Sequence, residues 1–332
     1  FLRPLRPLLR FIPVIKNYAN DRYFSRYLLY PQKARSVEGE INHVIDHSYG
    51  HLLFRLHPER TVVTCHDLIP LEYEEEAAAL SVFRYSVSGL KLAARIIAVS
   101  EATKNDLISK LNITPSKIRV VAEGVDGRQF QVQSSRFKVE EIRRQYHLPP
   151  GKILLHVGTN LRYKNMENIL KAFQIVLKSG ADAYLLKIGL LSAGQKDLAR
   201  SLGIESRVLE RSAAAEGDLP FLYNLAAVLV YPSLKEGFGF PVLEALACGL
   251  PVIVSRGTSL TEIAGPSGFN VNPNDPVSIA GAVNFALNLS YDQKQKVIES
   301  GLDRAKEFTW DKTAAETAKI YHEVYESLGG RK

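Results

Sequence analysis

Short runs of apolar residues alternate with longer amphipathic segments along most of this chain of 332 residues. The runs have the length of buried strands, and the segments between them have the length and periodicity of helices. Such alternation is typical of β–α–β units, whose parallel strands are buried beneath helices. The sequence therefore predicts an α/β fold with parallel sheets, and its length allows one large or two ordinary domains.

The second half of the chain shows this alternation most clearly. Strands are predicted at Lys152–Val157, Ala183–Ile188, Val228–Tyr231 and Pro251–Ser255. Helices are predicted at Asn165–Lys178, Pro241–Cys248, Ser278–Leu287, Tyr291–Lys306 and Lys312–Leu328. This order indicates a doubly wound domain, in which ligands bind beyond the carboxyl ends of the strands.

The first half is shorter and less regular. Strands are predicted at Ile41–Asp46, Thr61–His66, Arg95–Ser100 and Lys117–Ala122. Helices are predicted at Glu74–Ala94 and at Glu101–Leu111, the second with Ser100 as its N-cap. No clear strand with a glycine-rich turn precedes Ile41, so this domain is predicted to be doubly wound but shortened.

A polar stretch at residues 127–150 ends in Pro149-Pro150 and resembles a linker. We therefore predict an N-terminal domain at 1–148, with residues 1–40 atypical, and a C-terminal domain at 149–310. Residues 311–332 are predicted to form a helix that packs back on the N-terminal domain. Phe1 begins the chain without a methionine, which predicts that the natural N-terminus is missing.

The net charge of +7 lies in residues 1–35, which carry eight basic residues against Asp21 alone. This segment predicts peripheral contact with an anionic membrane, although a solvated surface explains the same charge and is slightly favoured. A nucleic-acid arm is unlikely, because no recognised module accompanies the basic residues. Two cysteines and the absence of a long apolar span predict a cytoplasmic protein, peripheral at most on the inner face of the membrane.

The segment Tyr231–Gly249 carries the strongest chemical signal. Its glycines, Gly237 and Gly239, let the backbone approach a ligand before a helix that begins with Pro241. The unpaired N–H groups of a helix start bind anions, and Glu236 and Glu244 could grip hydroxyls on either side of a diphosphate. An ordinary glycine-rich turn into a helix explains the two-glutamate spacing alone.

The whole segment closely resembles the signature of glycosyltransferase family four, retaining enzymes of the GT-B fold. The similarity continues through further motifs in order along the chain. These motifs are Thr64–Leu68, Val99–Leu107, Glu123–Asp126, His156–Thr159 with Lys164-Asn165, Pro251–Ser255, Leu260–Gly265 and Phe308–Trp310. The resemblance implies two Rossmann-like domains facing across a cleft, with donor and acceptor meeting between them.

The resemblance also implies roles for residues of the C-terminal domain. Glu236 resembles the contact to the donor sugar, Glu244 the contact to the nucleotide ribose, and Lys164 the cation that neutralises the diphosphate. The nucleotide-binding loop and helix start would comprise Gly237, Phe238, Gly239, Phe240, Pro241, Val242 and Leu243, with backbone N–H groups of Phe240, Val242 and Leu243 beside the sugar or diphosphate. Arg162 either substitutes for a family arginine, at whose position Thr159 stands, or faces solvent. Glu262 braces the loop on the nucleotide side.

His66 follows the predicted strand Thr61–Cys65, at the strand end where ligands bind. The resemblance implies that it faces the donor's phosphate and sugar, and we group it with Glu236 and Lys164 as the catalytic residues. Asp67, His47 and His51 are predicted to lie on the acceptor side.

No metal site is predicted. His43, His47, His51 and His57 are regularly spaced, but a strand at Ile41–Asp46 breaks the helical alignment that a metal site would need. The chain also lacks an Asp-x-Asp motif. We expect no cofactor apart from the donor substrate, a UDP- or GDP-sugar.

These features predict a metal-independent hexosyltransferase that moves a sugar, with retention, to a glycan, lipid-linked or small-molecule acceptor. A nucleotide-sugar epimerase or a phosphorylase fits the fold, but neither matches Tyr231–Gly265 as closely. Because the usual N-terminal strand and turn are not recognised, a nucleotide-sugar-binding or degenerate protein without a complete acceptor site is the alternative.

Overall fold

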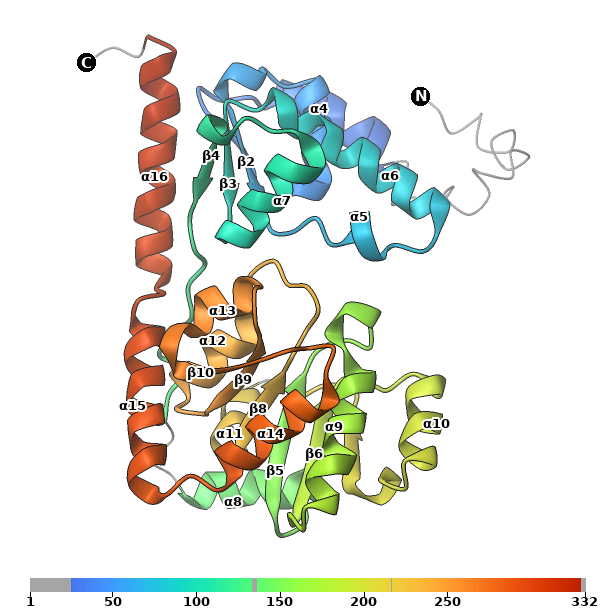
Figure 1. Cartoon of the computed structure of the whole chain (residues 1–332). Coiled ribbons are helices and arrows are strands. Elements are labelled where there is room, and N and C mark those ends of the chain that lie inside the picture. Colours follow the sequence, from blue (N-terminus) through green and yellow to red (C-terminus); the bar gives the residue numbers. More distant parts are fainter. Residues whose placement is uncertain (1–24, 133–135, 216, 330–332) are drawn as a thin grey trace. The chain divides into compact units, whose positions relative to one another are not determined.

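The computed structural model describes residues 25–132, 136–215 and 217–329, and these form two compact units (Figure 1). The first unit contains described residues up to Val121 together with residues 314–329, and the second contains the described part of Ala122–Thr313. Residues 1–24, which make up most of the basic segment at residues 1–35, lie outside the described residues.

The first unit is built on a parallel sheet with the order β1-β2-β3-β4. The strands are β1 (Asn42–Val44), β2 (Thr61–Cys65), β3 (Arg95–Ala98) and β4 (Ile118–Val120). The α-helices of this unit are α4 (Tyr30–Ser36), α5 (Pro70–Tyr73), α6 (Ala77–Ser88) and α7 (Glu101–Leu111), with shorter helical segments at Ser25–Leu29, His47–Phe54 (η3), Pro58–Arg60, Gly89–Leu92 and Pro115–Lys117. All four strands lie within or beside their predicted ranges.

Two predicted helices of this unit have different outcomes. The prediction for Glu101–Leu111 is confirmed, and the Ser100 hydroxyl accepts the hydrogen bond of the Thr103 N–H as an N-cap. The helix predicted at Glu74–Ala94 is confirmed over Ala77–Ser88 and is followed by the short helical segment Gly89–Leu92, but it begins later than predicted, because Glu74–Glu76 is not helical. There the Glu74 carboxylate accepts the Glu76 N–H, a local bond that competes with helix formation.

Helix α16 (Trp310–Ser327) begins in the second unit, and its larger part belongs to the first. Ile320 and Val324 are buried against Val62, Ile97 and Val121. The apolar side of the helix therefore completes the core on one face of the four-stranded sheet, as the ribbon beside β4 shows (Figure 1).

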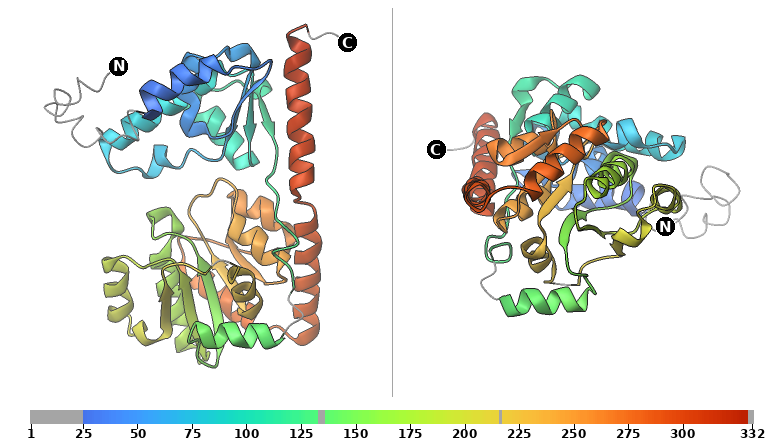
Figure 2. Two further views of the ribbon diagram at one scale, coloured as in Figure 1. Left: turned by 180° about the vertical axis from the view of Figure 1, so that it is seen from behind. Right: turned by 60° about the horizontal axis from the view of Figure 1, so that its bottom comes forward.

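The second unit is built on a six-stranded parallel sheet with the order β10-β9-β8-β5-β6-β7. The strands are β5 (Lys152–Val157), β6 (Ala183–Ile188), β7 (Val208–Arg211), β8 (Val228–Tyr231), β9 (Val252–Ser255) and β10 (Gly268–Val271). The helices are α8 (Arg136–Gln145), α9 (Met166–Lys178), α10 (Ala193–Ser201), α11 (Leu219–Leu225), α12 (Phe240–Ala247), α13 (Ser259–Ala264), α14 (Pro276–Leu287) and α15 (Tyr291–Lys306), with short turns at Arg162–Lys164 (η7), Glu205–Arg207 and Gly265–Ser267. Helices cover both faces of this sheet (Figure 2).

The polar stretch that resembled a linker contains helix α8. This helix directs Ile142 inward, and the following residues Tyr146 and Leu148 are also buried. Because these three apolar residues are widely spaced among charged ones, the stretch has the composition of a linker. The N-terminal segment of the first unit ends at Val121, earlier than the expected end of the first domain at residue 148.

The sheet order places the site of the second unit. From β5 the sheet grows through β6 and β7 in one direction and through β8, β9 and β10 in the other. The order therefore reverses between β5 and β8, and at such a switch point the loops after the two strands part to leave room for a ligand. Gly124 is pressed against the backbone at Thr309 and Trp310, where a Cβ atom would lie 2.3 Å from the Trp310 nitrogen. This contact explains why the Glu123–Asp126 and Phe308–Trp310 motifs occur together.

Candidate functional site

Two loops meet at the carboxyl ends of β5 and β8. The first leads from β5 through η7 into α9, and the second leads from β8 into α12. The Leu234 N–H donates to the Tyr163 carbonyl at 2.7 Å, which ties the second loop to the first. The site residues of these loops therefore have a common backbone support.

Asn165 is the main brace of this support, and the sequence analysis missed its role. Its backbone lies in the left-handed region with φ of 62°, and its side chain is buried. The amide nitrogen donates to the carbonyl of Pro232 at 2.8 Å and to that of Pro273 at 2.7 Å. The available signal in the sequence was an Asn at the start of a predicted helix, because Asn tolerates this backbone conformation better than most residues do.

Lys164 and Glu236 form an ion pair at the centre of the site. The Lys164 Nζ lies 2.7 Å from Glu236 Oε1, and it donates to the Tyr231 hydroxyl at 2.8 Å. Both charged side chains are about nine-tenths buried, with 12% and 9% exposed. Burial, and then the negative charge of Glu236, raise the pKa of Tyr231, so its hydroxyl stays protonated beside the pair. The structure thus brings together two of the three predicted catalytic residues and adds Tyr231.

Glu244 lies on α12 and is half-buried. The Tyr223 hydroxyl donates to Glu244 Oε2 at 2.7 Å. Burial raises the pKa of Glu244, and the hydrogen bond from Tyr223 offsets part of this shift. A carboxylate held in this way accepts hydrogen bonds from ligand hydroxyls with little reorganisation.

The start of α12 differs in detail from the prediction. Gly239 has φ of 123°, and a Cβ atom there would lie 2.5 Å from Leu260, so the position requires glycine. Pro241 is the second residue of the helix rather than the first. The N–H groups of Val242 and Leu243 donate to the Gly239 carbonyl at 3.0 and 3.2 Å. They are therefore not open to a diphosphate in this structure, because the helix already uses them.

The other predicted nucleotide-side residues have different surroundings. Phe238 is buried, with edge-to-face contacts to Phe240 and Phe308, which indicates a packing role. The side chain of Arg162 is exposed. Glu262 lies on α13, and its carbonyl accepts a hydrogen bond from Arg304. Gly237 lies in the loop before α12, beside Glu236.

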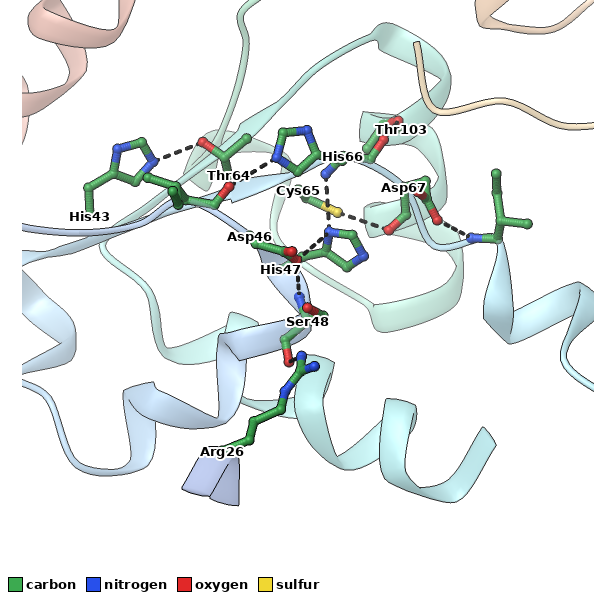
Figure 3. Close-up of polar contacts among 12 residues, drawn as sticks. Arg26, His43, Asp46, His47, Ser48, Thr64, Cys65, His66, Asp67 and Thr103 are labelled. Atoms are coloured by element: carbon green, nitrogen blue, oxygen red, sulfur yellow. Dashed lines mark hydrogen bonds and ion pairs between the residues drawn. The ribbon is translucent and has the colours of Figure 1, made fainter. Parts of the chain in front are cut away.

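In the first unit, His66 and His47 come together at the carboxyl end of β2 (Figure 3). The His66 backbone N–H donates to His47 Nδ1 at 3.2 Å, and the His66 ring donates from Nε2 to the Ile45 carbonyl at 2.9 Å. Burial is the largest factor that lowers the pKa of His47, so the ring is neutral and its Nδ1 is an acceptor. The approach of Asp46 to His47 at 3.6 Å is consequently not an ion pair at neutral pH.

Asp67 follows His66 and is half-buried, with its carboxylate accepting the Ile69 N–H at 2.9 Å. His51, by contrast, is 2% exposed, and its ring contacts those of Tyr27, Tyr49 and Tyr85. The acceptor-side prediction for His51 is not supported by this environment. An aromatic core encloses the side chain, so we assign it a packing role.

His43 is a member of this cluster that the sequence analysis did not select. Its Nδ1 lies 2.5 Å from the Tyr321 hydroxyl, and its Nε2 lies 2.8 Å from the Thr64 hydroxyl. The ring thus joins β1 and β2 to α16 within the first unit. No local sequence pattern predicts this contact, because Tyr321 is 278 residues away in the chain.

Three further observations concern the part of the chain that the structure describes. Across the ranges that the structure describes, no three His, Cys, Asp or Glu side chains gather as metal ligands. No helix in those ranges is both long and apolar enough to cross a bilayer. A surface hollow lined by Arg143, Arg144 and His147 lies beside Gly151, at the amino end of β5 and therefore at the opposite end of the sheet from Lys164.

Comparison with known families agrees with this geometry. Residues 138–304 match the family model of glycosyl transferases group 1, and residues 5–128 match that of Glycosyltransferase Family 4. The chain is 28% identical to O-antigen chain mannosyltransferase B of Escherichia coli, over 79% of this chain and 70% of that protein. It is 31% identical to D-inositol 3-phosphate glycosyltransferase of Corynebacterium kroppenstedtii, over 70% of this chain and 54% of that protein. It spans only 32% of serotype-specific mannosyltransferase WbdA of Escherichia coli, at 29% identity over 77% of this chain.

Solved structures show the same fold at low sequence identity. The structure of WaaG, a glycosyltransferase involved in lipopolysaccharide biosynthesis, matches with a TM-score of 0.72 and 15% identity, over 92% of this chain and 83% of that one. Anabaena Alr3699/HepE in complex with UDP and glucose matches with a TM-score of 0.72 and 18% identity, over 90% and 82%. The prediction of an α/β fold with two parallel sheets, of the GT-B type, is confirmed.

Proposed function

The chain belongs to the group 1 glycosyltransferases of family four, and from this premise we propose that it transfers a hexosyl group, with retention, from a nucleotide diphosphate sugar to an acceptor hydroxyl. The observation that carries the proposal is the contact of Lys164 with Glu236 and Tyr231 at the switch point of the six-stranded sheet. It places a cation and a carboxylate side by side where a doubly wound sheet binds its ligand.

The ion pair is suited to exchange partners when the donor binds. The diphosphate offers Lys164 oxygens that replace Glu236, and Glu236 is then free to accept hydrogen bonds from sugar hydroxyls. Glu244, which is held by the Tyr223 hydroxyl, accepts hydrogen bonds from the ribose hydroxyls. Each charged group keeps a partner in both states, which limits the cost of desolvation.

In the transfer step the bond between the anomeric carbon and the diphosphate oxygen breaks, and the acceptor oxygen bonds to that carbon. The acceptor loses its proton, and the diphosphate leaves with the electron pair of the broken bond. Lys164 stabilises the charge that develops on the leaving oxygen, a type of effect worth about 100- to 1000-fold in rate when a single donor is removed. His66 supplies a polar contact from the first unit to the donor or acceptor.

The names of the relatives guide the choice of substrates. Several relatives are named as mannosyltransferases, and two of these are O-antigen chain mannosyltransferases. We therefore propose a GDP- or UDP-hexose as donor, with mannose tested first, and a glycan or lipid-linked glycan as acceptor. Catalysis without a metal is part of the proposal, with Lys164 supplying the positive charge.

A donor screen tests this function. Thermal shift and product release would be measured with GDP-, UDP- and ADP-sugars for the wild-type chain, Glu236→Ala and the matched surface control Glu167→Ala. Stabilisation by one donor, kept in the control and lost in Glu236→Ala, is the expected result. NMR of the product would then show the anomeric configuration of the donor if the transfer is retaining.

Three other outcomes would contradict the proposal. A folded protein that no donor stabilises would exclude the donor site. Donor binding with neither transfer nor hydrolysis would instead support the binding-protein alternative, and a product of opposite anomeric configuration would exclude retention.

We propose in addition that the protein works in the cytoplasm, in peripheral contact with an anionic membrane. Of the basic segment, the described part exposes Leu28, Leu29 and Tyr30 beside Lys33 and Arg35. Exposed apolar residues flanked by cations favour the surface of an anionic bilayer. Cosedimentation with phosphatidylglycerol vesicles, but not with phosphatidylcholine vesicles, is the expected result, and equal recovery with both would contradict it.

A further inference from the structure

A second lysine lies beneath the loop that carries Lys164, and the mechanism above does not use it. Lys187 is the penultimate residue of β6, and its side chain is 0% exposed. Its Nζ donates to the carbonyls of Gly158 and of Ile188, the latter at 3.1 Å. In the part of the chain that the structure describes, no carboxylate forms an ion pair with it.

Gly158 separates the two lysine side chains. It follows β5 with φ of 151°, and a Cβ atom there would lie 3.7 Å from Lys164 Cε and 3.9 Å from His156 Nε2. The Lys164 side chain therefore lies against the Cα of Gly158, while the Lys187 ammonium donates to the carbonyl of Gly158. A buried cation thus lies directly behind the backbone at the strand end where the diphosphate is proposed to bind.

The groups that face Lys187 come from three neighbouring elements. His156 on β5 and Glu210 on β7 are its registered partners across the sheet, and Lys164 approaches from η7. Burial, and then the charge of Lys187, lower the pKa of His156 to about 3, and its Nδ1 lies 2.9 Å from the Val230 carbonyl. His156 is therefore neutral at physiological pH, with the proton on Nδ1, and its buried Nε2 has no partner.

Glu210 does not neutralise Lys187 through a direct contact. Its carboxylate accepts from Lys196 at 2.5 Å and from the Leu191 N–H at 3.0 Å. Burial opposes ionisation of Glu210, but these bonds outweigh it and lower its pKa. Glu210 thus stays ionised while its charge is engaged elsewhere.

Burial lowers the pKa of Lys187 to about 8, and the charge of Lys164 contributes in the same direction, against the opposing effect of Glu210. The ammonium is still largely charged at neutral pH, although it has only carbonyl dipoles and an unsatisfied imidazole beside it. Keeping a buried charge without a counterion is costly, and groups with strongly shifted pKa values cluster at functional sites.

We propose that Lys187 is a positioning residue of the donor site, whose buried charge complements the donor's diphosphate through the Gly158 backbone and gains a proton when the diphosphate binds. This inference rests on the proposed function, because it requires a nucleotide diphosphate as ligand. The bound anion favours the charged ammonium, so affinity falls as pH rises through the range in which Lys187 loses its proton. A change of one pKa unit on binding corresponds to about a tenfold change in affinity.

Isothermal titration calorimetry with UDP and GDP tests the inference. Titrations at about pH 7, about pH 8 and about pH 9, each in two buffers of different ionisation enthalpy, would compare the wild type, Lys187→Met and the exposed control Lys171→Met. The wild type and the control should take up a fraction of a proton near pH 8 and bind about tenfold more weakly at the higher pH. Lys187→Met should bind more weakly at pH 7 and show neither effect, whereas the ionisation of the nucleotide itself is common to all three proteins.

Wild-type binding without proton uptake near pH 8 would overturn the inference and leave the proposed function standing. This result needs no variant, so the test holds even if Lys187→Met does not fold. Equal pH dependence in a folded Lys187→Met would also overturn it. If neither nucleotide binds at any pH, the proposed function fails and the inference fails with it.

Discussion

Both parallel sheets end in a cluster of polar side chains, but the clusters are built from different chemistry. In the second unit, Lys164, Glu236 and Glu244 are charged groups on loops braced by Asn165 and shaped by glycine. In the first unit, the histidines are bound to one another and to backbone carbonyls, with His47 neutral. The cluster of the second unit recognises charge through a lysine and two glutamates, whereas the histidines of the first unit recognise hydrogen-bond geometry.

This difference indicates which property of a ligand each unit recognises, its charge or the direction of its hydrogen bonds. In the ion pair, Lys164 can bind the anionic diphosphate of the donor and Glu236 can bind its hydroxyls. Binding at this site should therefore depend strongly on electrostatics. The His66 ring, which is held by the Ile45 carbonyl, contributes a directed hydrogen-bonding group. The predictions below test this division between the two regions.

The largest effect is expected for Lys164→Ala. Loss of the cation leaves Glu236 with an unpaired buried charge and removes the stabilisation of the leaving diphosphate. Turnover of the donor should fall about 100- to 1000-fold in kcat/KM, measured by nucleotide release. Lys171→Ala, an exposed lysine on α9, is the control and should keep wild-type activity. A loss below fivefold in Lys164→Ala would contradict the charge-based reading of this region.

The next effect concerns the stability of the ligand-free protein at high pH. The folded pKa of Lys187 is about 8 against its ordinary value of 10.5, so between these values the unfolded chain binds more protons. Stability must therefore rise with pH in this window, by at most about 3 kcal/mol from this group. Urea unfolding of the second unit, followed by the fluorescence of Trp310, the single tryptophan, would measure the slope.

The variant Lys187→Met isolates this contribution. Its urea midpoint should change less with pH between about 8 and about 10.5 than that of the wild type, because one titrating group is gone. If the urea midpoints of the two proteins changed equally with pH, the pKa of Lys187 would be ordinary and its burial would not cost stability through its charge.

A smaller effect is expected for His66→Ala in the first unit. The variant loses the hydrogen bond to the Ile45 carbonyl and a polar contact to the charged substrate, so kcat should fall about 10- to 30-fold. The Kd of the nucleotide, measured by calorimetry, should be unchanged, since the charged residues of the second unit are intact. His57→Ala, whose side chain is 50% exposed, is the control. Nucleotide affinity lost in His66→Ala would refute the division between the regions.

The smallest effect is expected for Tyr223→Phe. The substitution removes the hydroxyl that donates to Glu244 at 2.7 Å and leaves a half-buried carboxylate less well held. Nucleotide affinity should fall about three- to tenfold, less than the full contribution of a hydrogen bond to a charged group, because Glu244 itself remains in place. Tyr291→Phe, at a side chain on α15 that is 77% exposed, should bind as the wild type does. An affinity equal to the wild type in Tyr223→Phe would show that Glu244 does not contact the ribose.

The parts of the fold that were predictable are those with strong local periodicity or a distinctive motif. Strands β5, β6, β8 and β9 are apolar and were found, whereas β7 and β10 were missed. Strand β7 has the sequence Val-Leu-Glu-Arg, and its four residues are only partly buried, so its composition does not announce a strand. Helix α8 was missed for the related reason that most of its residues are charged.

The candidate site was likewise predictable only in part. Glu236, Lys164 and Glu244 were selected because Tyr231–Gly249 and Lys164-Asn165 match a known signature. Three supporting residues were not selected as site residues, namely Asn165, Tyr223 and Tyr231. Each positions a loop or a charged side chain through hydrogen bonds, and this role has no sequence motif of its own. The N–H groups of Val242 and Leu243 were assigned to the ligand because the bonds within the first helical turn depend on where the helix begins.

The sequence by itself determined the kinds of elements and the residues that end them, because periodicity, glycine and proline act over a few neighbouring positions. Only the tertiary structure decided which of these residues meet. Lys164 reaches Glu236 across 72 residues of chain because β8 pairs with β5. Lys187 is buried because β6 lies between β5 and β7, a neighbourhood set by the order of strands in the sheet. Burial and pairing at this range depend on the packing of the whole unit, and they decide the charge state of the site.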